Sequence, residues 1–68
     1  MLKNYSRVRL LTNRFQSEGA FYGAMGYIIE VYDNAYEVEF SDEAGSTFAQ
    51  IVAEENELEL CEPALINH

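Results

Sequence analysis

Two segments in the middle of the chain alternate between hydrophobic and polar residues, which is typical of β-strands with one buried face. Residues 27–32 and 35–40 flank Asp33-Asn34, a dipeptide typical of tight turns. The pattern predicts a β-hairpin with a two-residue loop. Facing residues then share one side of the sheet, so one apolar side should point into the core. That side consists of three facing pairs: Val31 with Tyr36, Ile29 with Val38, and Tyr27 with Phe40.

The opposite side of the predicted hairpin carries Glu30, Glu37 and Glu39, with Tyr32 at its tip. A three-residue loop would place Glu30 beside Val38 and bury a carboxylate without a partner, so the two-residue loop is favoured. Glu30 then faces Glu37, and such a pair of like charges is destabilising by up to ~1 kcal/mol. Two interpretations remain open: water and salt screen the repulsion, or a basic partner covers this face.

The residues before the hairpin predict one more strand and a long loop. Residues 7–11 alternate and should form the first strand. Residues 12–24 contain Asn, Ser and Gly, which are typical of loops, together with Phe15, Phe21 and Tyr22. These aromatic side chains either pack beneath the sheet or form a contact surface, and we favour packing because large exposed apolar patches are uncommon.

The residues after the hairpin predict two further strands. Residues 42–46 should form a turn, 47–52 a fourth strand, 53–57 one helical turn and 58–60 a fifth strand, followed by a loose tail at 63–68. A helix over 47–58 remains an alternative, because the apolar residues of that segment also fall at helical spacing. We therefore expect one all-β domain over residues 1–68, with its core at about 7–62.

This order of elements resembles a small five-stranded SH3-like barrel, with a long first loop and one short helical turn before the last strand. The Gly23-x-x-Gly26 entry to the second strand is similar to the KOW-type entry of such domains, in which the residue at Ile28 is often part of the core. A bulge at Met25 or Gly26 would reconcile that likeness with the hairpin register. The longer pattern from Gly26 to Ala49 resembles a family of small uncharacterised bacterial domains. That resemblance implies an SH3-like fold, a small partner protein of antitoxin-like type and no active site.

Charge is unevenly distributed along the chain. Twelve Asp and Glu residues oppose four Lys and Arg residues, and the net charge is −8. All four bases lie in the first 14 residues: Lys3, Arg7, Arg9 and Arg14. Nucleic acid would be repelled by most of this surface, so we expect a basic protein as partner.

The sequence offers little for catalysis or for metal binding. Cys61 is the only cysteine, and we expect it to be a small, buried or half-buried hydrophobic side chain. The clustered glutamates lie on a strand face, which supplies too few ligands for a cation such as calcium. We expect no enzyme activity, no metal and no cofactor. The lack of an apolar run of signal-peptide or membrane-spanning length leads us to expect a soluble, cytoplasmic protein.

These observations predict a non-catalytic protein-interaction module whose acidic face binds a basic partner, in its sharpest form as an antitoxin or inhibitor. The candidate contact residues are Glu30, Tyr32, Glu37, Glu39 and Tyr22. The alternative is a KOW-like module that binds nucleic acid or ribosomes through the basic N-terminal segment. A third interpretation is a homo-oligomer formed by pairing of exposed edge strands.

Overall fold

The computed structural model describes residues 1–62, and the predicted tail at 63–68 lies outside the described residues. Its elements follow the chain as β1 (Arg7–Leu10), η1 (Gln16–Glu18), β2 (Met25–Val31), β3 (Tyr36–Ser41), β4 (Thr47–Ala53), η2 (Glu55–Glu57) and β5 (Leu58–Glu62). All strand pairs are antiparallel. The all-β prediction is confirmed, as are the strand over the fourth segment and the single helical turn before the last strand. The alternative helix over 47–58 is wrong.

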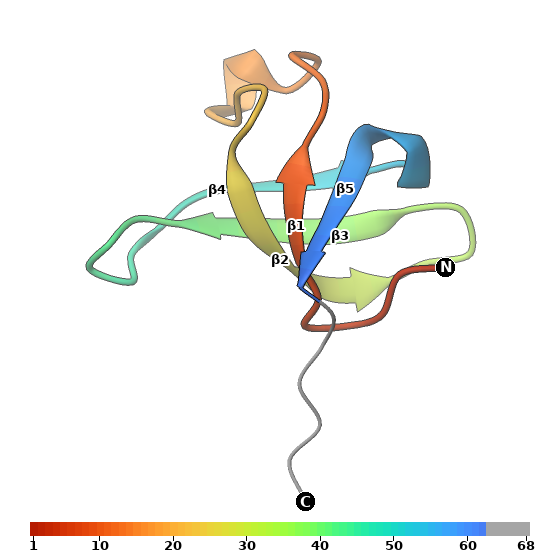
Figure 1. Ribbon diagram of the computed structural model, residues 1–68. Helices are drawn as coiled ribbons and strands as arrows, with labels where there is room; N and C mark the ends of the chain where they lie inside the picture. Colours follow the sequence, from red (N-terminus) through yellow and green to blue (C-terminus); the bar gives the residue numbers. More distant parts are fainter. Residues whose placement is uncertain (63–68) are drawn as a thin grey trace, which may run out of the picture.

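The strands form one five-stranded sheet in the order β4-β3-β2-β1-β5. In Figure 1, β1 and β5 run across the direction of β3 and β4, and β2 bends to pair with strands of both groups. Within residues 1–62, β4 and β5 do not pair with one another. The sheet is therefore strongly bent but open, and a closed barrel is not confirmed.

The core lies on the concave side of this bent sheet and receives side chains from every strand. Alternation delivers them: β1 is buried at every second residue, and so is β3. The loop before β2 adds Phe15 and Ala20. The largest fully buried side chains are those of Phe40, Leu10, Ile28, Val8 and Val38.

The hairpin register is only partly as predicted, because β2 contains a bulge. Val31 faces Tyr36 as expected, and Glu30 faces Glu37, but the register shifts between Ile28 and Glu30. Ile28, not Ile29, therefore faces Val38, and Tyr27 faces Glu39 instead of Phe40.

The bulge reverses the expected positions of two side chains. Ile28 is fully buried, as the KOW-type likeness implies, whereas Tyr27 is 52% exposed. Close packing at Gly26 explains the shift, because a Cβ there would lie 2.8 Å from the ring of Phe40. The Phe40 ring thus occupies the space beside Gly26 that a facing tyrosine would need. The bulge lies a little further along β2 than the Met25 or Gly26 position expected from the sequence.

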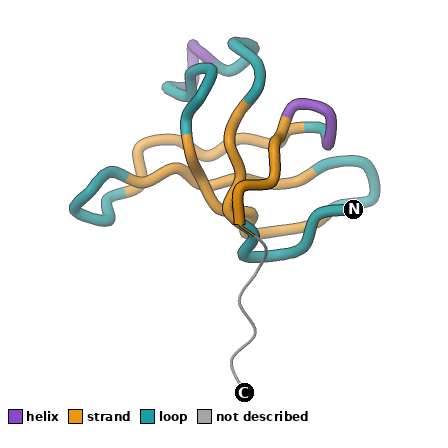
Figure 2. Tube along the Cα trace, viewed as in Figure 1, coloured by secondary structure: helices purple, strands orange, loops and turns teal. Residues whose placement is uncertain are grey.

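The long loop between β1 and β2 behaves differently at its two ends. Phe15 is buried as expected, but Phe21 and Tyr22 are exposed, so the prediction that these aromatics pack beneath the sheet is wrong for two of them. The loop returns to the sheet through Gly23, whose N–H donates to the Leu10 carbonyl (2.7 Å). Figure 2 shows both short helical turns outside the sheet: η1 lies within the loop between β1 and β2, and η2 directly precedes β5.

Candidate interaction surface

The predicted acidic residues lie together on the outer face of β2 and β3. Glu37 lies between Glu30 on β2 and Val52 on β4, and Glu39 lies between Tyr27 and Gln50. These residues alternate with the buried side chains of β3, which is why they face outward. The outer face of the three strands is thus built from two cross-strand rows with a glutamate of β3 at the centre of each.

Glu37 is held in place by two neighbours. The hydroxyl of Tyr32 donates to its Oε1 atom (2.6 Å), and the amide of Gln50 donates to its Oε2 atom. The hydrogen bond from Tyr32, followed by that from Gln50, lowers the pKa of the Glu37 carboxyl. The same bond raises the pKa of the Tyr32 hydroxyl. Glu37 is therefore a fixed carboxylate whose two oxygens already have donors.

Glu30 and Glu39 differ from Glu37 in their contacts. Within residues 1–62, neither side chain makes a hydrogen bond or an ion pair. Glu30 is exposed and Glu39 is partly exposed. These two carboxylates are free to meet a charge from outside, with Glu37 fixed between them.

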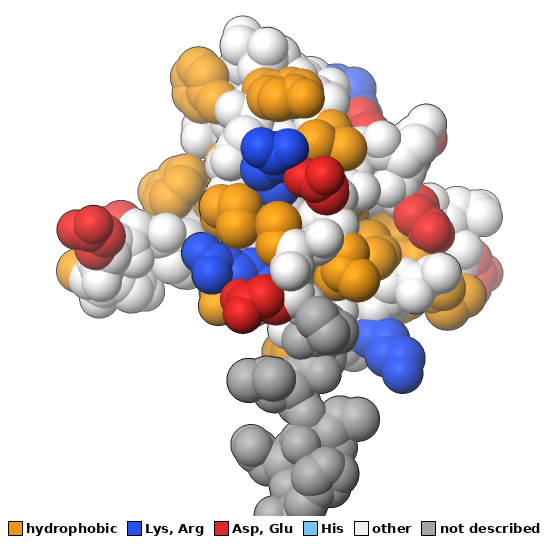
Figure 3. All heavy atoms as spheres, viewed as in Figure 1, with side chains coloured by type: hydrophobic (Ala, Val, Ile, Leu, Met, Phe, Trp, Pro, Cys, Tyr) orange, Lys and Arg blue, Asp and Glu red, His pale blue; other side chains and the backbone are white. Residues whose placement is uncertain are grey.

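Three of the four basic side chains form ion pairs with glutamates on β5 and η2, at the end of the sheet opposite β4. Arg7 contacts Glu62 (3.2 Å between Nη1 and Oε1), and Arg9 contacts Glu59 (2.8 Å between Nη2 and Oε1). Both pairs join β1 to β5. In Figure 3, blue and red side chains lie beside one another among exposed hydrophobic ones on the viewed face.

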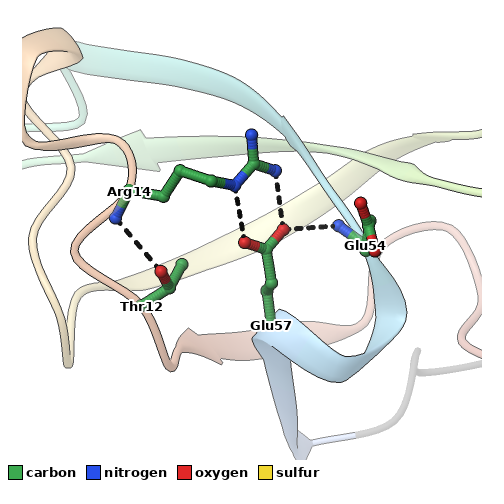
Figure 4. Close-up of polar contacts among 4 residues, drawn as sticks. All are labelled: Thr12, Arg14, Glu54 and Glu57. Atoms are coloured by element: carbon green, nitrogen blue, oxygen red, sulfur yellow. Dashed lines mark hydrogen bonds and ion pairs between the residues drawn. The ribbon is translucent and has the colours of Figure 1, made fainter.

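The third pair ties the long loop to η2 and has the geometry of a fork. Arg14 donates from Nε to Oε2 of Glu57 (2.7 Å) and from Nη2 to Oε1 (2.8 Å). Oε1 also accepts the backbone N–H of Glu54 (2.9 Å), which completes a capping box on η2. Figure 4 shows these contacts together with the bond from the Arg14 N–H to Thr12. The Arg14 hydrogen bonds lower the pKa of the Glu57 carboxyl and raise that of the guanidinium.

The charges of the protein are therefore segregated. The arginines neutralise glutamates on β5 and η2, while no Lys or Arg follows Arg14 in the sequence. The segment from Glu30 to Glu43 carries only acidic charges, which belong to Glu30, Asp33, Glu37, Glu39, Asp42 and Glu43. The hairpin face keeps its negative charge because none of the three arginine pairs involves it.

The structure does not bring Tyr22 to this surface. Tyr22 is 57% exposed, but it precedes β2 whereas Tyr32 follows it. The seven residues of β2 lie between the two tyrosines. The Tyr22 N–H donates to the side chain of Asn13 (2.9 Å), within the loop itself.

Sequence reasoning missed several members of the face. Tyr27 was assigned to the core, and only the bulge turns it outward. Gln50 and Val52 also lie exposed on β4, beside Glu39 and Glu37. The alternation of β4 with the buried Ala49, Ile51 and Ala53 was a signal in the sequence that could have identified them.

The remaining chemistry-bearing groups form no site in the described part of the chain. Among residues 1–62 no three His, Cys, Asp or Glu side chains are grouped so that they could hold a metal ion. Cys61 is exposed, so the expectation of a buried or half-buried side chain is wrong. Its Sγ lies 3.9 Å from the sulfur of Met25. Within residues 1–62 no helix has the length and apolar character required to cross a membrane.

These features define a small all-β domain with an open antiparallel sheet and an acidic, partly aromatic outer face. The chain belongs to the family described as "Domain of unknown function (DUF4926)", whose model matches residues 4–60. No curated protein and no solved structure matches it. The family description assigns no activity, so the function has to be argued from the surface.

Proposed function

We propose that this protein is a non-catalytic interaction module that binds a basic protein through the outer face of β2 and β3. The observation that carries the proposal is the direct opposition of Glu30 and Glu37 across the two strands, with Glu39 next along β3. A facing pair of like charges costs up to about 1 kcal/mol in an antiparallel sheet. A partner cation placed between them removes that cost and adds charge-assisted hydrogen bonds.

The neighbouring side chains suit such an interface. Tyr27 and Tyr32 are both about half exposed and flank the glutamates. Tyrosine is enriched at protein interfaces because it supplies a large contact area at a small entropic cost. The uncompensated negative field also accelerates the encounter with a positively charged partner.

The proposal extends to an antitoxin-like or inhibitor role in a bacterial cytoplasm, in which the acidic face covers a nucleic-acid-binding site of the partner. The one helical turn between the last two strands and the long loop after the first support an SH3-like classification of the fold. Partners of this kind bind strongly at low ionic strength and less strongly as salt is added.

The test compares two doubly substituted proteins that have lost the same charge. Glu30→Gln with Glu39→Gln removes the two free carboxylates of the face, whereas Glu18→Gln with Glu43→Gln removes two exposed acids elsewhere. Each protein is used as bait in an extract of the native cell, and captured proteins are quantified by mass spectrometry. The captured basic protein is then purified and titrated at low and high salt.

The expected result is a basic protein held by the wild type and the E18Q/E43Q control, and held at least tenfold more weakly by E30Q/E39Q. Its affinity for the wild type should fall as salt is raised. Equal binding by the two double variants would refute the proposal. An affinity that does not change with salt would also refute it.

The nucleic-acid alternative is less well supported by the geometry. It requires the N-terminal bases to form a free basic patch, but Arg7, Arg9 and Arg14 each contact a glutamate. A gel-shift experiment with short RNA at low salt distinguishes the two functions. We expect no shift, and a saturable shift that is lost when Arg9 is replaced by Gln would favour the alternative.

A further inference from the structure

The strand at one end of the sheet has an unusual composition for an edge. β4 is seven residues long and reads Thr-Phe-Ala-Gln-Ile-Val-Ala, without a charge or a proline. Proteins ordinarily protect edge strands with charges, prolines, short length or a covering segment, because an unprotected edge pairs with other chains. β5, at the opposite edge, is shorter and carries Glu59 and Glu62.

The ladder determines which backbone groups of β4 face outward. The Tyr32 N–H donates to the Ala35 carbonyl (2.8 Å), so these two residues form a hydrogen-bonded pair. Such pairs alternate along antiparallel strands, and the next residue, Tyr36, directs its backbone groups to the other neighbour, β4. Tyr36 pairs with Ala53.

The same alternation along β4 assigns the remaining residues. Ala53 and Ile51 bond to β3, whereas the N–H and C=O groups of Val52 and Gln50 point away from it, to the free edge. The assignment applies from Ala49 onward, because the register of the ladder shifts at Phe48. The carbonyl oxygen of Phe48 lies 3.5 Å from the position that a Cβ on Gly19 would take, on the side of η1.

Only the first half of the edge is covered. The segment with η1 lies against β4 at Phe48 and Ala49. In Figure 1 this segment is found at the same end of β4 as the turn from β3. Within residues 1–62, neither Gln50 nor Val52 makes a backbone hydrogen bond outside the sheet ladder. The open edge therefore runs from Gln50 to Ala53.

The charges beside this edge select its occupant. Gln50 and Val52 lie directly next to Glu39 and Glu37. Acidic residues without a base also precede β4, at 42–43, and follow it, at 54–57. A second copy of this chain would bring together two molecules of net charge −8, which disfavours self-pairing. An extended segment with Lys or Arg at alternate positions would instead place cations beside Gln50 and Val52, one strand away from the glutamates of β3.

We propose that the edge from Gln50 to Ala53 accepts an extended, basic segment of the partner as a sixth strand. Strand addition of this kind obtains affinity from main-chain hydrogen bonds and specificity from alternate side chains. Here the four outward groups of Gln50 and Val52 supply the bonds, and the free carboxylate of Glu39, one strand away on β3, favours cations. The inference rests on the proposed function, because it specifies how the basic partner is held.

A proline at Val52 tests the backbone contact without breaking the ladder. Proline is tolerated on edge strands where the N–H faces solvent, so Val52→Pro removes one outward donor and leaves the bonds to β3 in place. Val52→Thr is the matched control, because it keeps the N–H and the β-branched shape. The probe is a fluorescently labelled seven-residue peptide of alternating Lys and Val, and a Glu-Val peptide of equal length serves as its control.

Binding is measured by fluorescence anisotropy, and hydrogen exchange of the Gln50 and Val52 amides is followed by NMR in the full chain. The wild type and V52T should bind the Lys-Val peptide, V52P should bind it at least tenfold more weakly, and the peptide should slow exchange at both amides. If V52P does not fold, a Lys-Val peptide N-methylated along one edge replaces it and should also bind at least tenfold more weakly.

The outcomes separate the two proposals. Equal binding of the peptide by V52P and the wild type, or unchanged amide exchange, overturns strand addition. If the E30Q/E39Q variant still binds the basic partner more weakly than the wild type, the proposed acidic face is supported without strand addition. No saturable binding by the wild type, preference for the Glu-Val peptide, or a dimer of this chain through β4 in sedimentation would likewise overturn the inference.

Discussion

Shortening Ile28 by one methyl group should destabilise the protein more than the same change at Ile29, although the sequence pattern implies the reverse. Ile28 is fully buried against the core, and Ile29 at the bulge is only half-buried. The two residues are identical and adjacent, so the same atoms are removed at both positions. A difference in stability between the two variants therefore reports which of the two side chains the bulge directs into the core.

The magnitude follows from burial. Ile→Val substitutions in a core typically cost about 0.5–1.5 kcal/mol, and Ile→Ala about 2–5 kcal/mol. A domain of 68 residues has roughly 3–10 kcal/mol of total stability, so the cost of Ile28→Ala equals the lower part of that range and leaves too small a margin for a comparison. Ile28→Val is the usable variant, and about 1 kcal/mol should lower Tm by about 4–8 °C. Ile29→Val should lower it by less than half as much.

The assay is urea unfolding followed by circular dichroism, with thermal unfolding as a second measurement. The dependence of the unfolding free energy on urea should be the same in all three proteins, since a changed slope would indicate an altered unfolded state. A larger loss of stability in I29V than in I28V would refute the bulge. Ile29 would then point into the core, as a regular hairpin requires.

Three further predictions follow from the same structure. Gly26→Ala should destabilise the protein by about 1–3 kcal/mol in urea unfolding, since the added Cβ would lie 2.7 Å from a backbone oxygen; unchanged stability would contradict the close packing. The folded-state pKa of Glu57 is lowered by its bond to Arg14, so the stability it contributes is present above its unfolded pKa of about 4.3 and is lost as pH falls through the folded value. In Glu57→Gln the free energy of unfolding should therefore fall less between neutral and acidic pH than in the wild type. The same pH dependence in both proteins would show that the Glu57 carboxylate does not contribute to it. In the free protein the Val52 amide should exchange with solvent faster than the Ile51 amide, and equal protection would mean that the β4 edge is covered.

Local sequence pattern is sufficient to define the strands, the turns and the distribution of charge along the chain. Strict alternation in residues 36–40 defined β3 and its buried side, because only one register keeps its carboxylates out of the core. The turn at Gly45 was predicted correctly, and this residue has a positive φ of 86°. The prediction that Glu30 faces Glu37 was also correct, since the two-residue turn controls the register of the residues nearest to it.

Contacts between distant segments determine which side chains of β2 face inward and which glutamates the arginines contact. The bulge depends on how the Phe40 ring packs over Gly26, a contact between different strands that local alternation does not encode. The arginine pairs join residues far apart in the chain, such as Arg7 and Glu62, and exist because β5 returns beside β1. That return neutralises one side of the sheet and leaves the glutamates of the hairpin uncompensated. Local pattern thus sets strands and turns, while long-range packing decides which charges remain available to a partner.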